Sequence, residues 1–148
     1  MSNSSLATYQ RLTDNYDPRR NKIDTITIHC YVGQVTAKQG CDYFYNTDRE
    51  VSSNYVVGRD GSIGLSVAEN HRAWTSSSPS NDHRAITIEV ASDTKPPYAV
   101  TDKAYSALIT LVTDICKRND IKRLVWSDNK SNRVNHRNGC NMTVHRDF

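Results

Sequence analysis

Two segments far apart in the chain alternate strictly between apolar and polar residues. They are residues 24–29 (Asp-Thr-Ile-Thr-Ile-His) and residues 84–91 (Arg-Ala-Ile-Thr-Ile-Glu-Val-Ala). A period of two residues is that of a half-buried β-strand, in which successive side chains point to opposite faces. Each predicted strand therefore carries one ionisable side chain on its polar face, His29 in the first and Glu89 in the second.

Other local patterns predict helices, a hairpin and further short strands. Thr36 and Gln39 match a capping box, which predicts a helix over residues 37–45. Thr101 can cap a long helix with an apolar stripe that ends near residues 117–119. Asp60-Gly61 is typical of a hairpin turn. The further strands are expected at 54–58, 62–67, 124–127 and 142–145. We expect an α/β fold in three layers, a mixed central β-sheet flanked by helices.

Length and composition limit the class of protein. The 148 residues correspond to one domain, and 19 Lys and Arg against 16 Asp and Glu give a net charge of +3. This charge, with no basic stripe, argues against a nucleic-acid partner. No apolar run approaches the ~18 residues of a membrane span, and the first five residues do not form an export signal. We expect a soluble monomer, made in the cytoplasm, with no membrane contact.

Three residues are best suited to proton or metal chemistry, because each ends or interrupts an apolar strand: His29, Glu89 and His145. Two imidazoles can hold Zn²⁺, and a nearby carboxylate that is not a ligand can take a proton from water. The sequence has no local zinc signature such as H-E-x-x-H. From the residues alone, hydrogen-bonded structural histidines and a solvent-facing glutamate are the alternative interpretation.

Five motifs in order carry a resemblance to a known family. They are Thr-Ile-His-Cys (27–30), Ser-Ser-Asn-Tyr-Val-Val-Gly-Arg-Asp-Gly (52–61), Arg-Ala-Trp (72–74), Asn-Asp-His-Arg-Ala-Ile-Thr-Ile-Glu-Val-Ala (81–91) and Asn-Met-Thr-Val-His-Arg-Asp (141–147). The chain resembles the zinc-dependent N-acetylmuramoyl-L-alanine amidases, which are related to the peptidoglycan recognition proteins. It is most similar to the catalytic domains of phage or prophage endolysins of clostridia and related Gram-positive bacteria.

The resemblance implies an activity and assigns roles. By it, His29 and His145 correspond to the first and second zinc ligands, and Glu89 corresponds to the general base. It implies hydrolysis of the amide that joins N-acetylmuramic acid to the L-alanine of the stem peptide in bacterial peptidoglycan. The enzyme would then act at the bacterial cell wall, although the chain carries no export signal of its own.

The sequence departs from the family in three places. Relatives continue after the His-Arg-Asp motif to a third ligand, Cys or Asp, whereas this sequence ends at Phe148. We therefore expect residues 1–148 to be one amidase catalytic domain that lacks its C-terminal end, namely the third-ligand loop and last helix, with no cell-wall-binding domain. Ser53 stands where several relatives have a catalytic Tyr, and Thr75 where relatives often have His.

Candidate substrate contacts are Asn54, Trp74 and Arg84. Trp74 and the polar segment after it can form the wall of a glycan or peptide groove, because an indole is apolar with a polar edge. A surface loop anchored by one aromatic residue is the alternative. Arg84 can meet a carboxylate of the stem peptide through its planar fork, or pair within the fold with Asp82 or Asp93.

Two other functions compete with the amidase. A non-catalytic peptidoglycan-binding module would explain the absent third ligand but would not need His29, His145 and Glu89 together. A metal nuclease is suggested by Asn-His-Arg-Asn (135–138) in a basic chain. Such a nuclease needs a helix after its hairpin to carry the last ligand, and it needs a basic surface for phosphate. We therefore favour the amidase. We also expect Cys30, because of its strand parity, to point into the core.

Overall fold

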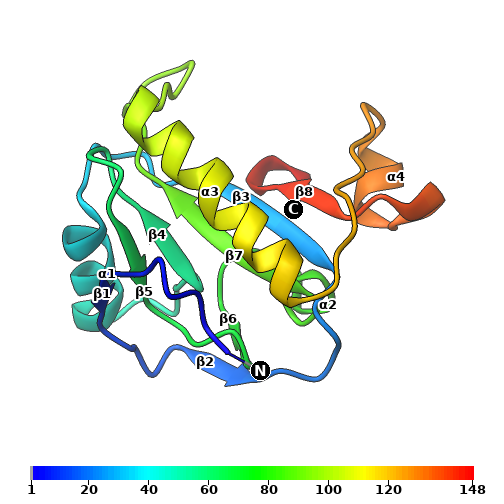
Figure 1. Ribbon diagram of the computed structural model, residues 1–148, viewed down its shortest axis with the longest axis horizontal. Helices are drawn as coiled ribbons and strands as arrows, with labels where there is room; N and C mark the ends of the chain where they lie inside the picture. The colour runs from blue at the N-terminus through cyan, green and yellow to red at the C-terminus, as the bar shows by residue number, and fades with distance from the viewer. Residues whose placement is uncertain (1) are drawn as a thin grey trace.

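A six-stranded mixed β-sheet forms the centre of the molecule in the computed structural model, which describes residues 2–148. In spatial order its strands are β1 (Tyr9–Gln10), β5 (Ile63–Leu65), β4 (Tyr55–Val57), β7 (Ala85–Val90), β3 (Thr25–Cys30) and β8 (Met142–Val144). The β4–β5 pair is antiparallel, and the other neighbouring pairs are parallel. The carboxyl ends of β7, β3 and β8 therefore meet at one edge of the sheet (Figure 1).

Helices cover both faces of this sheet, so the predicted mixed sheet flanked by helices is confirmed (Figure 1). The helices are α1 (Ala37–Asn46), α2 (Pro79–Asp82), α3 (Asp102–Arg118) and α4 (Lys130–Val134), with short 3-10 turns η1 (Arg137–Gly139) and η2 (His145–Asp147). A separate antiparallel pair joins β2 (Tyr16–Pro18) to β6 (His71–Ala73). No helix within residues 2–148 combines the length and apolarity needed to cross a membrane.

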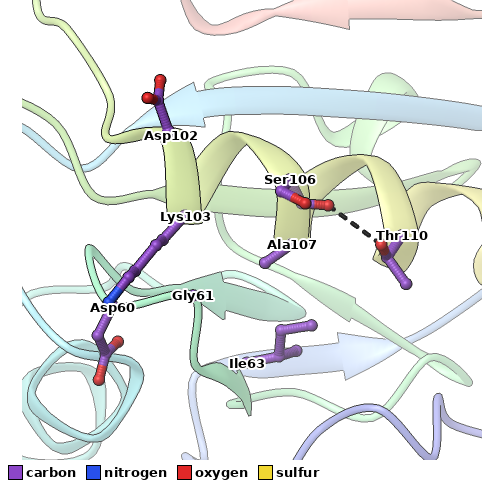
Figure 2. Close-up of a pocket in the computed structure, with 8 residues that line it drawn as sticks. All are labelled: Asp60, Gly61, Ile63, Asp102, Lys103, Ser106, Ala107 and Thr110. Carbon is purple, nitrogen blue, oxygen red and sulfur yellow. Dashed lines mark hydrogen bonds between the residues drawn. The ribbon is translucent and has the colours of Figure 1, made fainter.

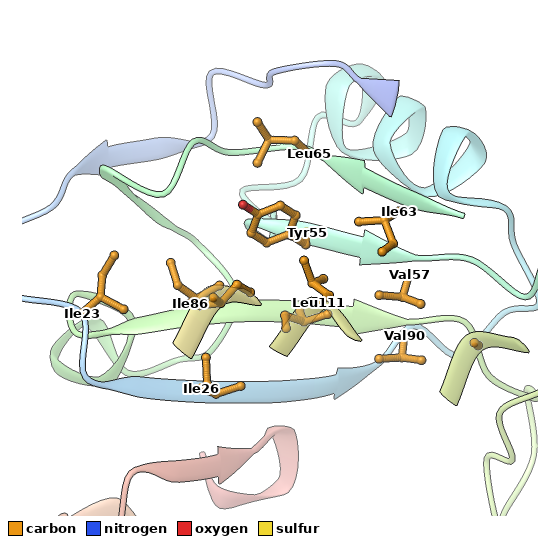
Figure 3. Close-up of a cluster of buried hydrophobic side chains, with 12 residues drawn as sticks. Ile23, Ile26, Tyr55, Val57, Ile63, Leu65, Ile86, Val90 and Leu111 are labelled. Atoms are coloured by element: carbon orange, nitrogen blue, oxygen red, sulfur yellow. The ribbon is translucent and has the colours of Figure 1, made fainter. Parts of the chain in front are cut away.

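The main hydrophobic core lies between the sheet and α3 (Figure 3). The alternating apolar positions of β3 and β7 face this helix, and their isoleucines Ile26, Ile86 and Ile88 are fully buried. From α3, Leu111 and Ile115 of the predicted stripe complete the contact. Removing this apolar area from water is the main stabilising contribution to the fold, at roughly 25 cal/mol per Å².

The opposite face of β3 and β7 is buried as well, so the prediction of half-buried strands is wrong. Thr27, which should face solvent in such a strand, is fully buried. Its hydroxyl lies 2.8 Å from that of Thr143 in β8 and accepts a hydrogen bond from Asn81 in α2 at 2.9 Å. Polar side chains can be buried here because they satisfy one another.

Local capping signals placed the helices correctly. The Thr36–Gln39 capping box is formed in both directions, and α1 begins at Ala37. Thr101 caps α3 through the amide of Ala104, and that helix ends at Arg118. The predicted hairpin is β4–β5, with Gly61 at φ +81 in its turn, a conformation that favours glycine.

Two predictions about strands are wrong. Residues 124–127 do not form a strand. Within this segment only Val125 hydrogen-bonds to Asn141, the residue that precedes β8. Cys30 is exposed rather than buried. Its neighbour β8 pairs with β3 only as far as Ile28, so no strand covers that side of Cys30.

Candidate functional site

Three side chains from three strands converge at the carboxyl edge of the sheet. His29 lies in β3, Glu89 is its register partner in β7, and His145 directly follows β8. The Nδ1 atoms of His29 and His145 are 2.7 Å apart, with the two rings nearly perpendicular at 77°. The Nδ1 of His29 is 3.9 Å from Oε1 of Glu89. Parallel pairing thus brings together residues that are 116 positions apart in the sequence.

The three groups differ in their access to solvent. His29 is 1% exposed, the Glu89 side chain is 15% exposed, and His145 is exposed. The buried atoms Nε2 of His29 and Oε2 of Glu89 have no hydrogen-bond partner. Most buried polar atoms in proteins are satisfied, so two unpartnered atoms in neighbouring side chains indicate a site built to receive another group.

Burial shifts the pKa values of His29 and Glu89 in opposite directions. Loss of hydration, with the nearby His145 adding to it, lowers the pKa of His29 to about 3. Loss of hydration raises the pKa of Glu89 to about 8. His29 is therefore a neutral imidazole with a free lone pair at neutral pH, and Glu89 is a stronger base than an ordinary carboxylate.

A buried ion pair fixes the turn that carries His145. Arg133 in α4 donates to both oxygens of Asp147, at 3.0 and 2.6 Å, and both residues are nearly fully buried. Asp147 also accepts from the amide of Val144 at 3.1 Å. The turn η2, which carries His145, is thereby anchored to α4 through Asp147. Sequence reasoning did not single out Arg133, because nothing local links it to a residue beyond η1.

Tyr31 is a second residue that sequence reasoning missed. It follows the end of β3 and is half-buried. Burial, and then the negative charge of Glu89, raise its pKa, so its hydroxyl stays protonated and able to donate. The sequence feature that could have identified Tyr31 is its position two residues after His29. Ser53, in contrast, donates to the carbonyl of Tyr55 and is fully buried.

The three predicted substrate contacts lie in different surroundings. Asn54 is fully buried and bonds to the backbone of Val67 and to Thr87. Arg84 makes a bidentate pair with Asp24, at 2.8 and 2.7 Å, at the amino end of β7, the opposite edge from Glu89.

Trp74 lines a pocket together with Asp17 and Arg72. It is half-buried, and its indole nitrogen donates to Asp17 at 3.0 Å. A different hollow, of about 530 Å³, lies between the β4–β5 turn and α3, lined by Asp60, Lys103 and Thr110 among others (Figure 2). It is on the α3 side of the sheet, away from the face that carries His29 and Glu89.

The donor chemistry at the edge fits two ligands of a zinc ion. Neutral imidazole nitrogens are common zinc ligands, and the two Nδ1 atoms lie within 2.7 Å of each other. Within residues 2–148, no group of three or more His, Cys, Asp or Glu side chains is arranged to hold a metal ion. A catalytic zinc site normally uses three protein ligands and an open position. The described residues therefore supply part of such a site.

Known structures with the same fold include amidases and endolysins. A selenomethionine derivative of AmpD superposes with a TM-score of 0.69 at 22% identity, covering 96% of this chain and 82% of that one. A mutant endolysin from Bacillus subtilis gives 0.66 at 18% identity, covering 93% and 82%. The amidase LysC from Clostridium intestinale gives 0.59 at 16% identity, covering 93% and 83%. A search of curated proteins gave no match.

The sequence profile described as N-acetylmuramoyl-L-alanine amidase matches residues 19–147. This range includes all three side chains of the carboxyl edge and nearly the whole sheet. The amidase resemblance expected from the motifs is thereby confirmed at the level of the family. This chain belongs to the N-acetylmuramoyl-L-alanine amidase family.

Proposed function

We propose that this protein hydrolyses the amide between N-acetylmuramic acid and L-alanine in bacterial peptidoglycan, with zinc held by His29 and His145. The observation that carries the proposal is the approach of the two Nδ1 atoms to 2.7 Å beside the Glu89 carboxylate. Family membership supports an amidase that acts on peptidoglycan. When bound, zinc would polarise the scissile carbonyl and lower the pKa of water toward ~7.

Glu89 is the proposed general base. Its raised pKa of about 8 suits a group that must accept a proton near neutral pH and then release it. The partly exposed carboxyl, whose Oε1 lies 3.9 Å from Nδ1 of His29, would take the proton from the attacking water. The same carboxyl would return this proton to the leaving nitrogen of L-alanine. Tyr31 can donate a hydrogen bond near Glu89 without losing its own proton.

Two histidines without a third protein ligand should hold zinc weakly. Zinc binding by this 148-residue chain is therefore expected to need excess metal, because the affinity for zinc is lower when fewer protein ligands hold it. The proposed biological role is that of an endolysin, made in the cytoplasm and acting on the cell wall as a monomer.

A second function is favoured by one observation. Because residues 2–148 contain no three-residue metal group, the domain could bind peptidoglycan without cleaving it. In that case muropeptide affinity would be the same with and without a chelator. The exposed position of His145 beside buried His29 favours the enzyme, since a binding module gains nothing from this pair.

The deciding experiment is mass spectrometry of soluble products from purified peptidoglycan, incubated with the chain and excess Zn²⁺. Stem peptides with a free N-terminal L-alanine, absent when a chelator is added, would support the amidase. The His29→Ala variant is the matched control and should release none. No release by a folded sample, together with retained muropeptide binding, would instead favour the binding module.

A further inference from the structure

The loop that joins α4 to β8 has a left-handed backbone at three of its residues (Figure 1). They are His136, Asn138 and Gly139, with φ values of 52°, 54° and 77°. Glycine adopts this conformation without penalty, and asparagine tolerates it better than most residues. The far end of the loop is fixed in the sheet, because the Asn141 carbonyl accepts from the amide of Ile26 in β3 at 3.0 Å.

Asn138 and Gly139 form the one Asn-Gly pair of the sequence, and both residues are exposed. A Cβ atom placed on Gly139 would have no other atom within 4 Å, so the backbone there has room to rotate. Nearby Asn135 donates from its carboxamide to the carbonyl and hydroxyl of Ser131, at 2.8 and 3.2 Å. The Asn138 carboxamide, in contrast, makes no hydrogen bond within residues 2–148.

An Asn-Gly pair can react with itself, because the backbone nitrogen of the glycine can attack the side-chain carbonyl carbon, Cγ, of the asparagine. The bond from this nitrogen to Cγ forms, the bond from Cγ to Nδ2 breaks, and ammonia leaves with the proton of the backbone N–H. Water then opens the cyclic imide at either carbonyl and gives aspartate or isoaspartate. Glycine favours the attack since it has no Cβ to hinder the approach. Asparagine is accordingly one of the thermolabile residues.

The surroundings of Asn138 favour this reaction. Asn138 lines a hollow of about 420 Å³ together with the exposed cations Lys22, Lys122 and Arg123. Attack by a backbone nitrogen requires the loss of its proton, so negative charge develops on the reacting atoms. Cations that already face this position stabilise the developing charge and lower the barrier.

Two carboxylates also line the hollow, but each already has a cationic partner. Asp24 makes a bidentate pair with Arg84 at 2.8 and 2.7 Å. Asp120 pairs with Lys122 at 2.7 Å. Arg123 makes no ion pair within residues 2–148, so its charge is the one most available to the reacting atoms.

We propose that Asn138–Gly139 is a self-modification site, where the Asn138 amide hydrolyses through a cyclic imide to aspartate and isoaspartate with Arg123 assisting. The reaction needs only solvent water, and it depends neither on zinc nor on the proposed amidase function. The new carboxylate would face the cations of the hollow. Isoaspartate would also add one carbon to the main chain shortly before β8, the strand that leads to His145. The site would thus act as a chemical clock next to this strand.

Peptide mass spectrometry of the full chain, sampled during incubation in mildly alkaline buffer, tests the site. Each conversion adds about 1 Da, and the two products separate by chromatography. We expect Asn138 to convert at least about tenfold faster than the hydrogen-bonded Asn135 in the same molecules. Asn138→Gln should show no conversion at this position, because the longer side chain would require a larger ring. Conversion of Asn138 no faster than that of Asn135 would overturn the proposal.

A matched pair of variants tests the role of the hollow. Arg123→Gln should slow conversion of Asn138 by roughly threefold, because it removes one nearby positive charge. Lys103→Gln removes an exposed cation from a different hollow, beside α3, and should leave the rate unchanged. In urea-unfolded chains all three proteins should convert at one rate. Equal rates for the two folded variants would overturn the assistance by Arg123. No zinc or peptidoglycan is present, so failure here is distinguishable from failure of the amidase assay.

Discussion

Two glutamates, Glu69 and Glu89, are both withdrawn from solvent but in opposite surroundings. Glu69 is fully buried and accepts hydrogen bonds from the Tyr55 hydroxyl, from Arg118 at 2.7 and 3.2 Å, and from Asn119 at 3.2 Å. Glu89 has one histidine at 3.9 Å, and its Oε2 has no partner. Both lie in the same small domain, so the difference arises from local contacts.

The contrast separates a carboxylate that supports the fold from one that is available for chemistry. A buried charge is tolerated when it is paired and hydrogen-bonded, as Glu69 is. An unpaired buried carboxylate is unstable as an anion, and burial raises the pKa of Glu89 to about 8 accordingly. The Glu69 cluster also binds the start of the chain, through the Arg118 bond to Ser2 and the Glu69 amide bond to Asn3.

The largest expected effect is on catalysis. Glu89→Gln should keep the fold and lower kcat/KM roughly 10²–10⁴-fold, because the amide cannot accept the proton from water. The rate of release of free L-alanine amino groups from peptidoglycan, measured with excess zinc, checks this. A rate near that of the parent would remove Glu89 from the proposed mechanism.

The next effect is on stability. Glu69→Ala should lower the free energy of unfolding by about 3–5 kcal/mol, since it leaves Arg118 and the Tyr55 hydroxyl without their acceptor. Urea unfolding followed by circular dichroism measures it. The exposed Glu50→Ala is the control and should change stability by no more than about 0.5 kcal/mol. Equal losses in both variants would contradict the structural role of Glu69.

Glu89 should also link the stability of the fold to pH. In metal-free protein, Glu89 has its ordinary pKa of 4.5 when unfolded and about 8 when folded, so the folded state binds more protons between these values. The stabilisation that protonated Glu89 contributes below pH 4.5 is therefore lost as pH rises toward 8. The free energy of unfolding falls by at most about 1.4 kcal/mol per pH unit over this range. Glu89→Gln should remove this loss. Parallel stability profiles for parent and variant over this range would be inconsistent with a buried, unpaired carboxyl.

The smallest effect concerns a paired carboxylate at the surface. Lys38 first, and then the Tyr9 hydroxyl and Arg11, lower the pKa of Asp42 to about 2. Its stabilisation is therefore present above its ordinary pKa of 3.8 and is lost as pH falls through about 2. Asp42→Asn should cost under about 1 kcal/mol at neutral pH, and this difference should shrink in acid. Urea midpoints at pH 2 to 6 check it, and a constant difference would argue against the ionised pair.

Short-range patterns predicted most of the elements correctly. Alternation located β3 and β7, and capping by Thr36 and Thr101 located the first residues of α1 and α3. These features depend on residues within one turn or strand, which a sequence displays directly. Alternation also predicted that one face of each strand would be exposed to solvent. That prediction is wrong, because Thr27 on this face is buried in contact with Asn81 of α2 and Thr143 of β8.

The candidate site depended on contacts that periodicity does not reveal. Nothing in the local pattern brings His145 to His29, and the family motifs supplied that pairing. Asn54, a predicted substrate contact, is fully buried, as is its neighbour Tyr55. The Arg133–Asp147 pair joins residues 14 positions apart, and the Arg118–Glu69 pair joins residues 49 apart. Such ion pairs form only in the assembled fold.

The parallel pairing of β3 with β8 also determines when the site can exist during synthesis. A nascent chain that has not yet reached residue 142 contains His29 and Glu89 but not the strand that delivers the second imidazole. Parallel strands distant in sequence pair slowly, because a long loop must close before any contact is gained. The two rings should therefore meet after the α3 core has formed. A spectroscopic probe of the His29–His145 pair would time the last step of folding.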